Sequence, residues 1–123
     1  ISHDLGVVAA SCARVAVMYA GTVVEEAPTA QLLANPRHPY AQGLIAAVPD
    51  LDNPAHKPRG IPGSIPNLMT PPTGCRFHPR CPYATDVCRS GEVELVWATP
   101  DQLSRCARIG EVSLAHDRLG AGR

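Results

Sequence analysis

The sequence has no excess of charge of either sign. Eleven lysine and arginine residues balance 11 aspartate and glutamate residues, and the formal net charge is zero. A protein dedicated to nucleic acid would show a basic footprint, so this balance argues against a nucleic-acid partner. Aromatic residues are also few, with one tryptophan, one phenylalanine and three tyrosines. The 123 residues suffice for one modest domain.

Long apolar segments are missing as well. No apolar run reaches the roughly 18 residues that a membrane-spanning helix needs. The N-terminus has no basic region ahead of an apolar stretch, which argues against a signal peptide. Without secretion, clustered cysteines indicate metal ligands more readily than disulfides. The chain begins with Ile1 rather than methionine, which predicts that it is a piece of a longer protein.

Four cysteines gather in a region that has little else to fold on. Nine of the 13 prolines lie between residues 49 and 82. Because proline removes backbone donors and fixes φ, that segment is not expected to form a helix or a central strand. A metal or cluster bound by four thiolates would hold it in place. The spacing is C-x5-C-x6-C-x17-C, with the cysteines at Cys75, Cys81, Cys88 and Cys106.

This spacing leaves three kinds of site open. Zinc sites usually pair ligands two to four residues apart, so the spacing fits zinc less well. Four thiolates at irregular spacing suit an iron–sulfur cluster, and Pro82 follows Cys81 as a proline follows a cluster cysteine in bacterial ferredoxin sites. Free buried thiols or an oxidised pair are the third possibility. A structural staple is expected rather than a redox catalyst, because no partner cofactor or substrate pocket is visible.

Basic residues flank the cysteines. Positive charge beside a thiol favours the thiolate, although solvated arginines are the alternative. His78 is interpreted as a neighbour of the ligands or a surface residue, since four cysteines suffice. Cys12 is separate from this group and is predicted to be a core residue on the apolar face of a helix. The arginines next to the four cysteines are Arg76, Arg80, Arg89 and Arg105.

The rest of the pattern predicts short helices and one hairpin. Apolar residues recur at helical spacing over residues 5–12, behind Ser2 or Asp4 as the cap. Residues 14–19 and 22–26 are expected to form a hairpin around a turn at 20–21, and the first strand is apolar on both faces, which suggests a larger sheet. One short edge strand is expected at residues 93–97. A polar linker is expected at residues 50–59.

Two short helices are expected between the hairpin and the linker. One runs from residue 28 or 29 to residue 33 and ends at Asn35-Pro36. The next covers residues 40–47 behind Pro39, and His38 is expected to fix its start rather than bind metal. Gly43 weakens this helix by about 1 kcal/mol relative to alanine.

Three patches, in this order, resemble one family. The first is Ser-His-Asp-Leu-Gly-Val-Val-Ala at residues 2–9, followed by Arg-Val-Ala-Val-Met-Tyr-Ala-Gly-Thr-Val-Val-Glu at 14–25; it is similar to the end of an ABC-transporter ATPase domain. The second is Asn-Pro-Arg-His-Pro-Tyr at 35–40, which resembles the start of the C-terminal extension of oligopeptide and dipeptide importer ATPases. The third is Pro-Pro-Thr-Gly-Cys-Arg-Phe-His-Pro-Arg-Cys-Pro at 71–82, which resembles the cysteine-rich end of that extension. Together they narrow the resemblance to the peptide and nickel importer group.

The resemblance implies an α/β fold and a division of the chain. Residues 1–34 would be the C-terminal fragment of a P-loop ATPase domain, with a hairpin and helices. Residues 35–110 would be a mostly irregular extension rich in proline and cysteine, and residues 111–123 a frayed tail. His3 would be the switch histidine, which senses the γ-phosphate of ATP and helps align water. The four cysteines would hold a [4Fe-4S] cluster, with zinc as the alternative.

The resemblance also implies an activity for a parent protein. That protein would couple hydrolysis of ATP, bound with Mg²⁺, to uptake of oligopeptides or dipeptides. It would lie on the cytoplasmic face of the plasma membrane, with permease subunits, a second ATP-binding subunit and peptide from a binding protein as partners.

The chain alone lacks the family's phosphate-binding G-x-x-x-x-G-K-[ST] loop and its Leu-Ser-Gly-Gly signature. It is therefore expected to be inactive by itself. The alternatives are a stand-alone metal or iron–sulfur interaction module, the ATPase subunit of a nickel importer, or a partial reading frame without activity.

Overall fold

The computed structural model describes residues 1–2, 4–48 and 60–109. His3, the expected linker at 50–59 and the expected tail at 111–123 lie outside these residues. The described part is a small α/β domain with one antiparallel sheet of strand order β1-β2-β4-β3. None of its helices is long and apolar enough to cross a membrane. The elements are α1 (Leu5–Ser11), β1 (Arg14–Tyr19), β2 (Thr22–Pro28), α2 (Thr29–Ala34), α3 (Pro39–Ala46), η1 (His78–Arg80), α4 (Asp86–Arg89), β3 (Val96–Thr99) and β4 (Gln102–Ser104).

The predicted hairpin forms from β1 and β2. Its turn residues Ala20 and Gly21 have φ angles of 49° and 83°, as a two-residue turn with both φ angles positive requires. On β1, Val17 and Tyr19 are buried, whereas Met18 between them is 59% exposed. One face of the strand therefore packs on the core, and the other is open.

A bulge in this hairpin sets the direction of two side chains. Val17 pairs with Glu25 and Met18 pairs with Val23, so Val24 is an extra residue on β2. In a bulge two residues oppose one partner, and the local alternation of side chains is broken. Val24 and Glu25 are consecutive and yet both buried. A glutamate thereby enters the interior.

The predicted first helix is present, and its cap is Asp4. The Asp4 carboxylate accepts hydrogen bonds from the backbone N–H groups of Gly6 at 2.8 Å and Val7 at 3.3 Å. The prediction that Cys12 is a core residue is wrong, because Cys12 is exposed just beyond the end of α1. No residue of α1 is buried. Two apolar residues of α1, Leu5 and Val8, are half-buried, and the helix contacts α2.

The next two helices also agree with the prediction. Helix α2 ends at the cap Asn35, and α3 begins at Pro39 behind His38. His38 does fix the start of α3, since its Nδ1 accepts the backbone N–H of Tyr40 at 3.0 Å. Glycine at position 43 has a packing reason: a Cβ there would come within 2.9 Å of the Ile61 side chain.

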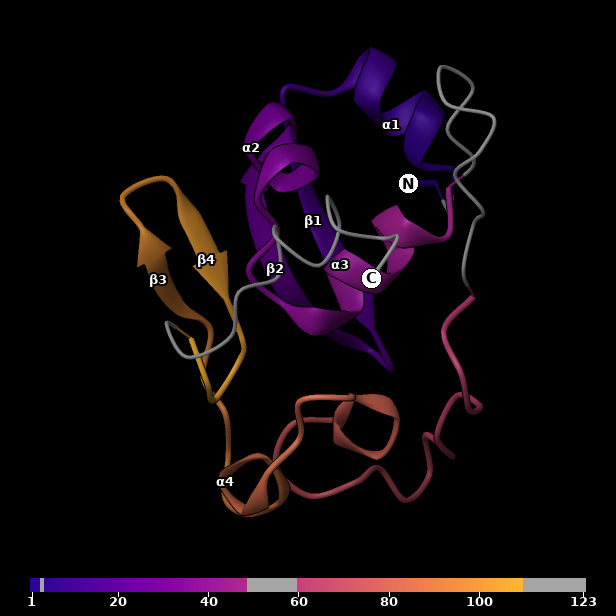
Figure 1. Cartoon of the computed structure of the whole chain (residues 1–123), viewed down its shortest axis with the longest axis vertical. Coiled ribbons are helices and arrows are strands. Elements are labelled where there is room, and N and C mark those ends of the chain that lie inside the picture. The colour runs from indigo at the N-terminus through magenta and orange to yellow at the C-terminus, as the bar shows by residue number, and fades with distance from the viewer. Residues whose placement is uncertain (3, 49–59, 110–123) are drawn as a thin grey trace.

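The C-terminal part of the sheet differs from the prediction. A single strand was expected at residues 93–97, but the structure has the hairpin β3–β4, and β4 pairs with β2 through Glu25↔Ser104 and Glu26↔Leu103. Figure 1 shows this hairpin continuing the sheet beside β2. The sequence conceals β4 because its inward residues are polar: Gln102 and Ser104 are buried. Strands from both predicted segments, 1–34 and 35–110, thus share one sheet.

The cysteine-rich segment packs on this sheet through an aromatic cluster. Phe77 is 2% exposed, and its ring lies 5.2 Å from that of Tyr19 and 5.4 Å from that of Tyr40. The Tyr19 and Tyr40 rings are themselves 4.6 Å apart. Such pairs contribute about 0.5–1.5 kcal/mol each beyond their buried area. The prediction that this region has little else to fold on is therefore wrong.

Candidate functional site: a pocket lined by four thiols

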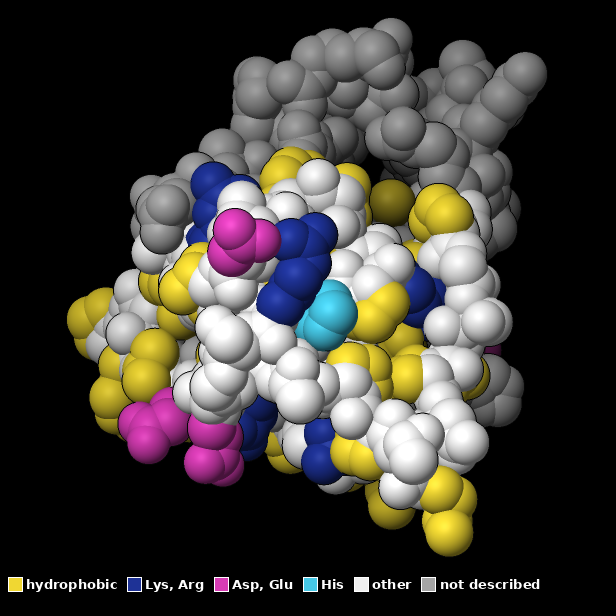
Figure 2. Space-filling model, turned by 90° about the horizontal axis from the view of Figure 1, so that it is seen from below, with side chains coloured by type: hydrophobic (Ala, Val, Ile, Leu, Met, Phe, Trp, Pro, Cys, Tyr) yellow, Lys and Arg dark blue, Asp and Glu magenta, His cyan; other side chains and the backbone are white. Residues whose placement is uncertain are grey.

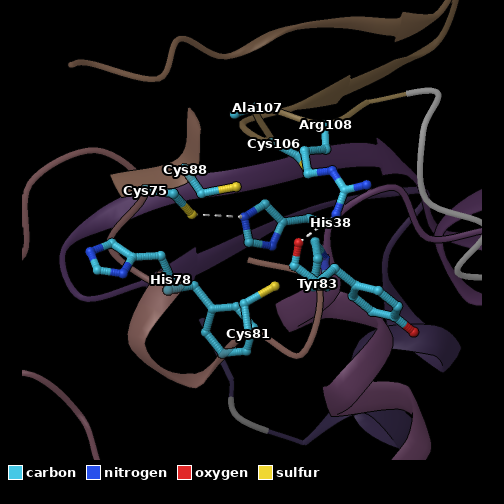
Figure 3. A pocket seen from close by; sticks show the side chains of 11 residues that line it. His38, Cys75, His78, Cys81, Tyr83, Cys88, Cys106, Ala107 and Arg108 are labelled. Carbon is cyan, nitrogen blue, oxygen red and sulfur yellow. Dashed lines mark hydrogen bonds between the residues drawn. The ribbon is translucent and has the colours of Figure 1, made fainter. Parts of the chain in front are cut away.

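The structure brings the four predicted cysteines to one pocket. Cys75 and Cys88 are buried, and Cys81 and Cys106 are half-buried. In Figure 3 the sulfurs of Cys75, Cys81 and Cys88 surround the ring of His38. The segments that supply them are the loop before η1, the residue after η1, helix α4 and the loop after β4. The lining residues are His38, Pro39, Cys75, Phe77, His78, Cys81, Tyr83, Cys88, Cys106, Ala107 and Arg108.

A close backbone approach holds two of these cysteines together. The N–H of Cys75 donates to the carbonyl oxygen of Cys88 at 2.9 Å, and the hydroxyl of Thr73 donates to the carbonyl of Arg89 at 2.7 Å. Gly74 lies between these contacts with a φ of 74°. A Cβ on residue 74 would overlap the Cys88 carbonyl oxygen. Only glycine fits this position, for reasons of both φ and space.

His38 lies at the inner wall of the pocket and is fully buried. Burial lowers the pKa of its imidazole to about 3, so the ring is neutral. Its Nε2 lies 3.9 Å from the Sγ of Cys75. His78, in contrast, points away from the sulfurs (Figure 3), and its Nδ1 is buried without a hydrogen-bond partner among the described residues.

Burial raises the pKa of the thiols of Cys75, Cys81 and Cys106, and that of Cys81 reaches about 12. Each thiolate would also repel the others at this site. The positive charge of Arg105 acts to lower the pKa of Cys75. The positive charge of Arg108 acts to lower the pKa of Cys81 and of Cys106. These thiols are therefore protonated unless a cationic centre offsets the burial.

The arginines next to the cysteines mainly brace the backbone. Arg76 donates to the carbonyl of Ala20 at 2.6 Å. Arg80 donates to the carbonyls of Pro62 and Ile61 and to the Tyr19 hydroxyl. Arg105 donates to the carbonyls of Val23 and Val93. Arg89 instead forms a surface ion pair with Asp86 at 2.9 Å. The alternative of freely solvated side chains thus fails for Arg76, Arg80 and Arg105.

The outer surface near this pocket carries side chains of both charges. Figure 2 shows the end of the molecule that lies lowest in Figure 1, where the cysteine segment and α4 are found. Arginine, hydrophobic and uncharged side chains are interspersed there around one histidine; one acidic group touches the basic side chain beside it, and other acidic groups lie toward the edge. On this visible face, charge alone would not attract a particular partner.

Cysteines in proteins can hold either a single metal ion or an iron–sulfur cluster. Among residues 1–2, 4–48 and 60–109, no three histidine, cysteine or acidic side chains are arranged to hold a single metal ion. The cavity has a volume of about 10 Å³, roughly the space that one water molecule needs. Four cysteines facing one pocket fit an iron–sulfur cluster in kind and number.

Sequence reasoning missed the buried polar residues that support His38. The Glu25 carboxylate accepts the N–H of Arg37 at 2.9 Å and the N–H of His38 at 2.9 Å. It also accepts the side-chain amide of Gln102. Ser104 donates to the carbonyl of Arg37 at 3.0 Å. The only sequence signal is that Glu25 follows Val23 and Val24 within the strand predicted at residues 22–26.

The ionisation of Glu25 reflects two opposing influences. Burial raises its pKa from the ordinary 4.5 to about 7, although the donors from Arg37, Gln102 and His38 act to lower it. Burial is the largest influence, and it outweighs these uncharged donors together with the positive charge of Arg37, which also acts to lower the pKa. N–H donors approach both carboxylate oxygens, so a proton on Glu25 would displace one of these hydrogen bonds.

Comparisons with known proteins define the class of the chain. Residues 24–88 match the family model described as oligopeptide/dipeptide transporter, C-terminal region. This match covers more than half of the 123 residues. The chain therefore belongs to this family and is homologous to the C-terminal region of peptide-import ABC ATP-binding proteins. The resemblance noted in the three sequence patches is confirmed.

Individual relatives agree with this assignment. The probable peptide ABC transporter ATP-binding protein y4tR of Sinorhizobium fredii is 46% identical over 91% of this chain and 34% of its own length. The oligopeptide transport ATP-binding proteins AppD of Bacillus subtilis and OppD of Salmonella typhimurium are 43% and 44% identical over 86% of the chain. They are covered over 32% and 31% of their own lengths. The chain thus spans about a third of the length of these curated relatives.

Two glycines with nearly the same φ angle, Gly74 and Gly91, test the geometry of the thiol loop. Gly74→Ala is expected to lower the free energy of unfolding by about 3 kcal/mol or more, because it adds a clash with the Cys88 carbonyl to the strain of a positive φ. Gly91→Ala is the matched control: Gly91 has a φ of 73° and nothing within 4 Å of a Cβ. It should cost only about 1–2 kcal/mol. Urea denaturation of both variants makes the comparison, and equal losses would contradict the described packing.

Proposed function

We propose that this chain is the C-terminal part of an ATP-binding subunit that couples ATP hydrolysis to the uptake of oligopeptides or dipeptides. The observation that carries the proposal is that the two segments typical of the family's extension, His-Pro-Tyr and the cysteine loop, meet at one buried pocket through His38 and Cys75. The relatives' names support a peptide cargo. The whole subunit would bind ATP and Mg²⁺ and pair with a second ATP-binding subunit.

The same proposal places the subunit at the cytoplasmic face of the plasma membrane. There it would dock on permease subunits, which receive peptide from a binding protein. His3 would be the residue of this chain that touches the γ-phosphate, directly ahead of the helix that Asp4 caps. The phosphate-binding loop is absent from the sequence, so the chain would contribute to hydrolysis only together with the rest of such a subunit.

A chimera tests this function. The corresponding C-terminal third of Salmonella OppD is replaced by the chain, and oligopeptide uptake is measured in cells that lack OppD. We expect uptake to return, and to fall at least about 100-fold with His3→Ala, because one preorganised electrostatic contact to a transition state contributes about that much. His56→Ala, which changes a histidine of the predicted polar linker at residues 50–59, serves as the control and should leave uptake unchanged.

Accumulation of the chimera must be verified by immunoblot. A chimera that accumulates normally and pairs with its partner subunit, yet transports nothing, would contradict the proposed function. The stand-alone interaction module would then be the better reading. Normal uptake in His3→Ala would leave the family role intact and remove the role of His3.

We further propose that the four thiols hold a [4Fe-4S] cluster, with zinc as the alternative. Four cysteines on one pocket support it, as does the braced loop that carries them. When bound, the cluster would supply a cationic iron centre that allows the buried thiols to ionise. Cys75, Cys81, Cys88 and Cys106 would each provide one thiolate, and the cluster would fasten the loop to the sheet.

Metal analysis of the anaerobically purified chain tests this site. We expect iron and acid-labile sulfide in equal amounts, at about four of each per chain for this cluster type. Both should be lost in Cys75→Ser and in Cys81→Ser. Cys12→Ser is the matched control, because Cys12 is exposed and is not part of the pocket. Zinc without sulfide would establish the alternative, and a chain without metal would contradict both.

A further inference from the structure

We propose that His38 is a positioning residue for the thiol site, which donates its Nε2–H to the Sγ of Cys75 and thereby raises the reduction potential of the bound cluster. The effect on the potential rests on the proposed cluster. The hydrogen bond itself rests on the geometry of His38 alone. Its role therefore goes beyond the capping of α3.

The tautomer of His38 follows from its two contacts. Nδ1 lies 3.0 Å from the backbone nitrogen of Tyr40. A backbone N–H can only donate, so Nδ1 must accept and carries no proton. A neutral imidazole then has its proton on Nε2. That nitrogen lies 3.9 Å from the Sγ of Cys75, the contact drawn as a dashed line in Figure 3, and the backbone of Arg105 is a further hydrogen-bond partner of the ring.

The surroundings fix this ring in place. The backbone N–H of His38 donates to Glu25 at 2.9 Å, and Pro39 follows directly with its restricted φ. The ring lies 6.0 Å from that of Phe77, and the residue is fully buried. His38 cannot turn to offer Nε2 as a metal ligand unless Nδ1 takes the proton and the cap of α3 is lost. The imidazole is therefore a donor to sulfur rather than a fifth ligand.

Such a donor has a defined effect on a cluster. The reduced cluster carries one more electron than the oxidised cluster, and part of that charge resides on the cysteine sulfurs. The positive end of the N–H dipole stabilises the more negative form. Hydrogen bonds to the sulfurs are among the features that set the potentials of these centres. Removal of the donor should therefore make the cluster harder to reduce.

His38→Asn separates the two roles of the residue. Asparagine is a good cap, so its side-chain oxygen can still accept the N–H of Tyr40, but the shorter side chain does not reach Cys75. Tyr83→Phe is the control, because Tyr83 lines the same pocket while its hydroxyl points away from the sulfurs. Iron and sulfide are measured in both variants. The midpoint potential is measured by anaerobic titration with dithionite and redox dyes.

We expect His38→Asn to keep the iron and sulfide content of the parent chain and to lower the midpoint potential. A tenfold change in the ratio of oxidised to reduced cluster corresponds to about 59 mV for one electron, and the shift should be of that order. Tyr83→Phe should leave the potential unchanged. An unchanged potential in a fully loaded His38→Asn variant would overturn the proposal.

A second measurement does not depend on iron. Nitrogen-15 NMR of the histidine rings in the metal-free full chain reports which ring nitrogen carries the proton. A protonated Nε2, whose shift changes in Cys75→Ala, supports the hydrogen bond, and a protonated Nδ1 overturns it. If the parent chain binds no iron, the proposed cluster and its potential fall together. The NMR result then decides the positioning role alone.

Discussion

The buried carboxylate of Glu25 is the interaction on which the rest of the structure depends. It accepts hydrogen bonds from the backbone of Arg37 and His38 and from the side chain of Gln102. Three segments far apart in the sequence are thereby joined at one point. A buried carboxylate is costly unless its oxygens accept hydrogen bonds. These hydrogen bonds therefore hold β2, β4 and the segment after α2 in their relative positions.

The geometry of the thiol pocket depends on these hydrogen bonds to Glu25. Glu25 fixes the backbone of His38, the His38 ring reaches Cys75, and Cys75 is bonded through its N–H to Cys88. Phe77 and the arginine contacts hold the same loop from the other side. A metal cluster would therefore add to a site that the protein has already assembled, rather than create order in an otherwise unsupported loop.

Local signals in the sequence were enough for the first half of the fold. The turn at Ala20-Gly21, the cap Asp4 and the prolines at the helix starts each act on neighbouring residues, and the elements they predict are present. The spacing of the cysteines also indicated a shared site. Cys12 was placed in the core by its helical periodicity alone, which does not reveal whether another element covers that face.

The remaining features depend on contacts between distant residues. Gln102 and Glu25 are 77 positions apart, and each taken alone is typical of a surface residue. Strand β4 is three residues long and has polar inward side chains, so it shows no apolar alternation. Phe77 could be seen as an aromatic residue among prolines, but not as the partner of Tyr19 and Tyr40. Burial of polar groups in pairs leaves no periodic pattern.

The most direct test of the role of the buried Glu25 carboxylate is the free energy of unfolding of Glu25→Gln, measured against the parent chain from pH 4.5 to pH 8. The pKa of Glu25 is raised from 4.5 to about 7 in the folded chain, so the folded state keeps a proton that the unfolded state has lost between these values. The contribution of protonated Glu25 to the free energy of unfolding is fully present below pH 4.5 and is lost as the pH rises through 7.

The stability of the parent chain minus that of Glu25→Gln should therefore fall across this window, by on the order of 3 kcal/mol. Other groups cancel in the difference, including His38, whose lowered pKa of about 3 gives a contribution of opposite sign. Glu26→Gln is the matched control, because Glu26 is the neighbouring carboxylate on β2 and pairs with Arg14 at the surface. A difference for Glu25→Gln that does not fall with pH, or that falls no more than the difference for Glu26→Gln, would contradict the account.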